Sequence, residues 1–286
     1  MKSKILAKLD IDNNKVMHDL SLVEKSGFDS VYKEYAFGIW HTKMLWNNTG
    51  SDESRLSQEY AGHAQKNSIG KQTRYLNSLI ESNFKLAQLK SVRIFRSQNG
   101  GLILPHIDYL EFKSGFKRIH LVLSSDATCL NSENNTVYNM QPGELWFLDG
   151  REVHSALSAS WSGKACLVLD FSNDANLEEI FCEGNQFSFR NLVPKIVNDR
   201  TKWSDDAHQA FIQLAATANM QTIKGMIGLA CNFHFYHRLS CIEMFQLTDE
   251  AFLQHSCEEV RGYYKSLRSL LIEKGYLPSI LRELQA

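Results

Sequence analysis

The strongest pattern in the chain is a series of short apolar runs between residues 91 and 172. Some of these runs alternate with polar residues and others are nearly continuous, as strands of a half-buried or fully buried sheet require. Residues that favour turns separate them, at Asn99-Gly100-Gly101, Asn134-Asn135 and Pro142-Gly143. Strands this short and this closely spaced predict a jelly-roll barrel, also called a double-stranded β-helix.

The hydrophobic period changes on both sides of this region. Before about residue 90 we expect short strands mixed with helices, one of them led by residues 71–73 and running through Phe84. After about residue 185 the pattern predicts helices over 207–218 and 223–245. A last amphipathic helix is expected from a stripe of apolar residues: Leu253, Cys257, Val260, Tyr264, Leu267 and Leu271. Thr248 is expected to cap the start of this helix and Gly275 to end it.

Together these patterns predict an α+β fold in two parts. Residues 1–185 are expected to form a jelly-roll domain with flanking N-terminal helices, and residues 186–286 a C-terminal helical bundle. A chain of 286 residues is long enough to bury a large core.

Composition agrees with a soluble enzyme, and the cysteines favour a cytoplasmic one. Hydrophobic residues make up 43% and charged residues 22% of the chain, which is ordinary for a globular protein. The net charge of −1 gives no general attraction to nucleic acid or to an anionic membrane. The first residues are too polar for a signal peptide, and there is no long apolar stretch. Six scattered cysteines without a Cys-x-x-Cys pair fit reduced thiols, and whether the chain forms a homodimer is left open.

The candidate chemistry begins with two imidazoles and a carboxylate. His106 and Asp108 stand two apart at a strand end, so they project to the same side, and His154 follows 48 residues later at the start of another predicted strand. Two histidines and one carboxylate on one face of a metal are the ligand set of non-haem Fe(II) oxygenases. We therefore predict that His106, Asp108 and His154 bind Fe(II) and are the catalytic centre.

Cations near this triad suggest how a cosubstrate is held. An oxygenase that uses 2-oxoglutarate needs a cation for the distal carboxylate, and Lys164 lies ten residues after His154 at the head of a buried strand. Arg118 opens another buried strand and is a second candidate, either for the cosubstrate or for an ion pair with Asp170. Arg96 shares a strand face with Val92 and Ile94 and is a candidate clamp for a substrate carboxylate, or else part of a structural ion pair.

Several motifs resemble the bacterial hydroxylases that act on free L-proline, especially the proline 3-hydroxylase branch. The resemblance extends over most of the chain and is carried by Phe37-Gly38-Ile39-Trp40, Leu104-Pro105-His106-x-Asp108, Pro142-Gly143-Glu144-x-Trp146-Phe147-Leu148-Asp149-x4-His154-Ser155 and Leu167-x-Leu169-Asp170-Phe171. These enzymes resemble the wider aspartyl/asparaginyl β-hydroxylase superfamily of Fe(II)/2-oxoglutarate dioxygenases. One position departs from the family pattern, which has arginine where this sequence has Lys164.

This resemblance implies hydroxylation of a free L-amino acid, first of all L-proline at its 3- or 4-position. The reaction consumes O2 and 2-oxoglutarate and releases succinate and CO2. Hydroxylation of another free amino acid, or of an Asp or Asn side chain in a peptide, is the alternative within the same chemistry. Outside it, a zinc hydrolase could use the same three ligands, and a binding or sensor protein of the same barrel would lack an intact triad.

Overall fold

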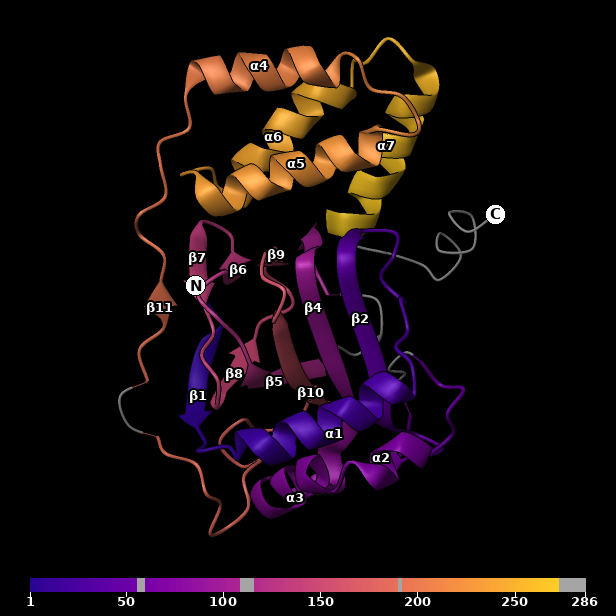
Figure 1. Ribbon diagram of the computed structural model, residues 1–286, viewed down its shortest axis with the longest axis vertical. Helices are drawn as coiled ribbons and strands as arrows, with labels where there is room; N and C mark the ends of the chain where they lie inside the picture. The colour runs from indigo at the N-terminus through magenta and orange to yellow at the C-terminus, as the bar shows by residue number, and fades with distance from the viewer. Residues whose placement is uncertain (56–59, 109–115, 190–191, 273–286) are drawn as a thin grey trace.

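The structure is a computed structural model that describes residues 1–55, 60–108, 116–189 and 192–272. Its centre is a curled antiparallel sheet, with helices α1, α2 and α3 at one end and α4–α7 at the other (Figure 1). The strands are β1 (Lys4–Lys8), β2 (Ala36–Asn47), β3 (Gln65–Lys66), β4 (Leu89–His106), β5 (Phe116–Ser124), β6 (Cys129–Glu133), β7 (Thr136–Asn139), β8 (Glu144–Leu148), β9 (His154–Ser158), β10 (Lys164–Ser172) and β11 (Lys195–Ile196). The helices are α1 (Asn13–Lys25), α2 (Ser68–Gln72), α3 (Arg74–Asn83), α4 (Asp205–Ala215), α5 (Ile223–Tyr236), α6 (Cys241–Phe252) and α7 (Glu258–Ile272), with a short 3-10 turn at Leu86–Gln88.

The sheet confirms the predicted jelly-roll class. The described strands follow the order β1-β8-β5-β10-β4-β9-β6-β7-β11, with β2 paired to β4 and β3 paired to β2. The long strand β4 pairs with β10 along its first half and with β9 along its second half. β4 therefore joins the two leaves of a half-barrel, one that contains β10 and one that contains β9.

The change of partner along β4 occurs at a bulge. The sequence predicts a turn at Asn99-Gly100-Gly101, and this prediction is wrong because β4 continues through these residues. Three residues of β4, 99–101, here face the single residue Gly38 of β2. Asn99 has a φ of 53° and Gly100 a φ of 75°, and these left-handed conformations are ones that Asn and Gly adopt at low cost. The turn residues thus bend one strand instead of separating two.

The other two turn predictions are confirmed. Asn134-Asn135 joins β6 to β7 as a two-residue hairpin loop, with Asn134 at a φ of 52°. Gly143 precedes β8 with a φ of 81°. A Cβ at this position would lie 2.2 Å from the carbonyl oxygen of Leu9, so only glycine fits.

The helices near the N-terminus follow their sequence pattern. The Asp12 side chain caps α1 by accepting hydrogen bonds from the backbone amides of Asn14 and Lys15. The predicted helix after residues 71–73 is α3, whose buried face includes Leu76, Leu79 and Ile80. These side chains share a core cluster with inner strand residues such as Leu121 and Leu167.

The region after residue 185 is helical, as predicted, but the bounds of its helices differ from the prediction. The expected helix over 223–245 is two helices, and Ser240 begins the second with a capping box to Glu243. The last helix begins at Glu258, so Thr248 is not its cap. Thr248 lies inside α6, where its buried hydroxyl bonds to the carbonyls of Met244 and Phe245 and to Tyr264. Gly275 lies outside the described residues.

Sheet and tail helices are packed together through one apolar cluster. Leu102 and Ile103 of β4 belong to the same cluster as Phe235 of α5 and Leu271 of α7. The backbone amide of Ile107 also donates to the carbonyl of Leu271, at 2.9 Å. In the described part of the chain, no helix is both long enough and apolar enough to cross a membrane.

Candidate metal centre

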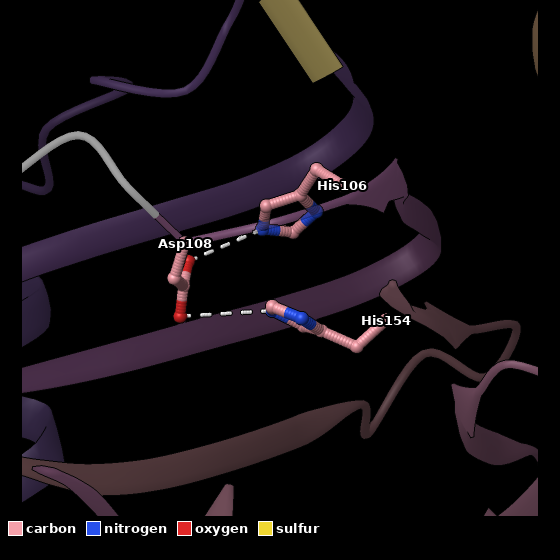
Figure 2. Close-up of side chains that lie close together, drawn as sticks. All are labelled: His106, Asp108 and His154. Carbon is pink, nitrogen blue, oxygen red and sulfur yellow. Dashed lines mark ion pairs between the residues drawn. The ribbon is translucent and has the colours of Figure 1, made fainter. Parts of the chain in front are cut away.

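The structure brings His106, Asp108 and His154 together at the adjoining ends of β4 and β9 (Figure 2). One ligand atom from each of the three residues lies within 4.8 Å of the other two. The Nε2 atom of His106 is 3.5 Å from Asp108 Oδ1, and Nε2 of His154 is 3.7 Å from Asp108 Oδ2. Two imidazole nitrogens and a carboxylate thus face a common point, as the sequence predicts.

Backbone carbonyls fix the orientation of both imidazoles. His106 Nδ1 lies 2.7 Å from the carbonyl oxygen of Leu104, and His154 Nδ1 lies 2.9 Å from that of Glu152. A carbonyl only accepts hydrogen bonds, so each Nδ1 carries the proton and each Nε2 has a lone pair for a metal. Burial, with His106 close by, lowers the pKa of His154 to about 4, which keeps this ring neutral at pH 7. These donors fit a divalent metal held on one face.

Gly150 allows Asp108 to reach this point. The amide of Asp108 donates to the carbonyl of Gly150 at 2.7 Å. A Cβ on residue 150 would lie 2.6 Å from the Cβ of Asp108 and 2.9 Å from its Oδ2. Glycine is therefore needed for the close approach of the loop after β8 to the metal ligand.

A buried chain of ion pairs holds the carboxylate of Asp108. Arg118 donates from Nη1 to Asp108 Oδ2 at 2.7 Å and from Nε to Asp170 Oδ1 at 2.8 Å. Asp170 also accepts from Arg93 Nη2 at 2.8 Å, and Arg93 Nη1 donates to the Tyr32 hydroxyl at 2.8 Å. Burial alone would raise the pKa of Asp108, but Arg118 and the two histidines hold it well below its usual range. The ion pair that the sequence offered as one role for Arg118 is present.

A cavity opens beside the triad between the two leaves of the sheet. The triad residues line it together with Arg118 and His120 of β5 and Lys164 and Cys166 of β10. Lys164 is 7% exposed, and its ammonium donates to Asn131 Oδ1 on β6 and lies 3.6 Å from Met140 Sδ. The predicted cation is therefore inside the same cavity as the predicted metal ligands.

His120 is a further polar side chain in this cavity. Both of its ring nitrogens are buried and have no hydrogen-bond partner among the described residues. Burial, reinforced by Lys164 and Arg118, lowers its pKa well below the usual range, so the ring is neutral. A neutral imidazole offers one donor and one acceptor to whatever occupies the cavity.

Arg96 does not line the cavity. It shares a strand face with Val92 and Ile94 as expected, but that face belongs to the core cluster on the other side of β4. The cavity face of β4 carries Phe95 and Ser97, and two residues earlier on the same face is Arg93. Sequence reasoning missed Arg93, although its alternation with Phe95 could have indicated it. His234 of α5 also lies outside the cavity: it is buried, and its ring nitrogen Nδ1 is hydrogen-bonded to the carbonyl of Leu239.

Comparison with known proteins gives one family and a small set of relatives. A profile described as aspartyl/asparaginyl beta-hydroxylase matches residues 9–174. The L-proline cis-4-hydroxylase of Rhizobium meliloti (strain 1021) is 29% identical over 251 residues, which are 87% of this chain and 88% of the relative. An L-proline cis-3-hydroxylase of Streptomyces sp is 26% identical over 253 residues, 86% of each chain.

A solved structure was also found. It is an oxidoreductase of the 2OG-Fe(II) oxygenase family from Burkholderia pseudomallei, with 11% sequence identity and a TM-score of 0.38. The match covers 57% of this chain and 79% of the other.

Proposed function

Because the chain belongs to the aspartyl/asparaginyl β-hydroxylase family, whose profile spans residues 9–174, we propose that this Fe(II)/2-oxoglutarate dioxygenase hydroxylates a free L-amino acid. L-proline is the first substrate to test, because the relatives that align along most of the chain are named L-proline cis-4- and cis-3-hydroxylases. The observation that carries the proposal is the triad of His106, Asp108 and His154, whose donor atoms face one point. The names of these relatives leave two products to distinguish, one hydroxylated at ring position 3 and one at ring position 4.

In this proposal the triad holds the metal and nearby residues keep it in place. Iron(II), when bound there with 2-oxoglutarate and O2, supplies the oxidation that replaces a substrate C–H bond by C–OH. Arg118 keeps Asp108 in its ligating position, because its guanidinium bridges Asp108 and Asp170. The imidazoles need no reorganisation, since both Nδ1 atoms already have carbonyl partners.

Lys164 is proposed to bind the distal carboxylate of 2-oxoglutarate. An ammonium has three donors, and Asn131 and the weak acceptor Met140 occupy at most two of them. His120 lies on the neighbouring strand in register with Val168 and can donate to the same ligand from within the cavity. Arg118 is a second candidate contact, because it lines the same cavity.

The test is a reconstitution that separates the alternatives. The purified chain is loaded with Fe(II) without oxygen, mixed with 2-oxoglutarate and a panel of free amino acids, and analysed by mass spectrometry after O2 is added. Gain of one oxygen atom on L-proline, with an equal amount of succinate, supports the proposal. Oxygen gain only on an Asp- or Asn-containing peptide would replace the substrate class. Hydrolysis without 2-oxoglutarate would favour the zinc enzyme, and His154→Ala is the inactive control.

A further inference from the structure

One polar group in the cavity has no role in the proposal above. Trp40, on β2, lines the cavity and is only 8% exposed, yet its indole N–H has no hydrogen-bond partner among the described residues. Leaving a buried donor unsatisfied costs about 1–3 kcal/mol. An indole nitrogen can only donate, so a ligand that satisfies it has to offer an acceptor.

The sheet register places Trp40 away from the cation at Lys164. Trp40 pairs with Ser97 of β4, and Ser97 pairs in turn with Lys164 of β10. With strands about 4.8 Å apart, the backbones of Trp40 and Lys164 are separated by roughly 10 Å. A dicarboxylate bound between the metal and Lys164 therefore leaves the Trp40 side of the cavity for a second ligand.

That side has an aromatic wall. Tyr32 and Phe95 also line the cavity, with their rings edge to face at 5.9 Å. Such a wall takes the apolar body of a small ligand, whereas the indole N–H takes its polar end.

The charges around the cavity favour a second ligand that carries an anionic group. The charged residues that line the cavity, taken with those in their chain of ion pairs, are three cations, Arg93, Arg118 and Lys164, and two carboxylates, Asp108 and Asp170. A divalent metal and a doubly charged 2-oxoglutarate cancel one another. One positive charge remains in excess, and it favours an anionic group on the second ligand.

We infer that Trp40 is a substrate-binding residue, whose indole Nε1–H donates to the carboxylate of the amino-acid substrate while the wall of Tyr32 and Phe95 holds its body. This inference rests on the proposed function and adds the residue that recognises the α-carboxylate. A hydrogen bond to a charged acceptor is stronger than a neutral one, so this contact orients the substrate as well as binding it.

The test compares Trp40→Phe with a matched control, Trp46→Phe. Trp46 lies on the same strand and is also buried, but its indole donates to Asn77 Oδ1 at 3.0 Å in the core on the other side of the sheet. Binding is measured by anaerobic titration calorimetry on protein loaded with Mn(II) and 2-oxoglutarate. The probes are L-proline and pyrrolidine, which shares the ring but has no carboxylate.

We expect Trp40→Phe to weaken L-proline binding about ten- to a hundredfold and to leave pyrrolidine and 2-oxoglutarate binding unchanged. Trp46→Phe should lower the melting temperature without changing either affinity. Equal loss for L-proline and pyrrolidine would reduce Trp40 to a packing residue, and a loss confined to 2-oxoglutarate would assign it to the cosubstrate; either result overturns the inference. If the wild type makes succinate but its substrate is another amino acid, that amino acid and its decarboxylated amine replace the probes. A wild type that makes no succinate refutes the proposed function, and the inference with it.

Discussion

Replacing Lys164 by methionine tests how the cosubstrate is anchored, because methionine keeps much of the side-chain volume and removes the charge. Lys164 is 7% exposed, and Asn131 Oδ1 already orients its ammonium, so the side chain is placed to bind a carboxylate. A hydrogen bond to a charged group contributes about 1.5–3 kcal/mol. At about 1.4 kcal/mol for each factor of ten, the Michaelis constant for 2-oxoglutarate should rise roughly ten- to a hundredfold.

The assay is succinate formation at saturating amino acid, with 2-oxoglutarate varied. Lys164→Arg should recover part of the affinity, because it keeps the positive charge but must fit a wider group among Asn131, Met140 and Cys166. The Michaelis constant for the amino acid should change much less in both variants. An unchanged constant for 2-oxoglutarate in Lys164→Met would refute this reasoning and make Arg118 the next anchor to test.

Three further predictions concern the metal ligands and their support. His154→Ala should abolish metal binding and turnover but change the melting temperature little, since His154 begins a strand beside the cavity. Metal content and thermal unfolding are the measurements. Full activity in this variant would show that His154 is not a metal ligand. Gly150→Ala should weaken Mn(II) binding at least tenfold, because its Cβ would displace Asp108; titration calorimetry with an intact fold is the measurement, and wild-type affinity would contradict it. Asp170→Asn should destabilise the fold by about 3–5 kcal/mol, because two buried guanidinium groups lose the carboxylate that they share. Burial alone would raise the pKa of Asp170, but Arg118 and Arg93 outweigh it and lower the pKa to about 2. The ionised carboxylate therefore contributes fully to the free energy of unfolding above about pH 4, and this contribution is lost as the pH falls toward 2. Denaturant melts of the wild type and Asp170→Asn should converge over that range.

The metal ligands could be predicted from the sequence because their geometry is local. His106 ends β4 and Asp108 follows two residues later, so alternation sends both side chains to the same side, and His154 starts the strand that pairs with this end of β4. Local geometry does not decide which of Arg93 and Arg96 lies on the cavity face of β4. Alternation says that they face opposite ways, but only the packing of β4 against the core decides which face meets the cavity.

Turn and cap residues were ambiguous for a related reason. Asn99-Gly100-Gly101 permits left-handed backbone, and this suits a bulge as well as a hairpin; the pairing of β4 with β9 and β10 decides for the bulge. Thr248 has a side chain that can cap a helix or bond within one, and its burial beside Tyr264 selects the second role. In both cases the deciding interaction involves residues distant in the sequence.

The hydrogen bond from Ile107 to Leu271 connects the segment that carries two metal ligands to helix α7. Ile107 lies between the ligands His106 and Asp108, and its backbone N–H donates to the carbonyl of Leu271 in α7. We therefore expect a metal that holds residues 106–108 in place to stabilise the packing of α7, and the packed helix to raise the affinity for metal, because a coupling between two sites acts in both directions. A protease is therefore expected to cleave within α7 more slowly in the metal-loaded protein than in the metal-free protein.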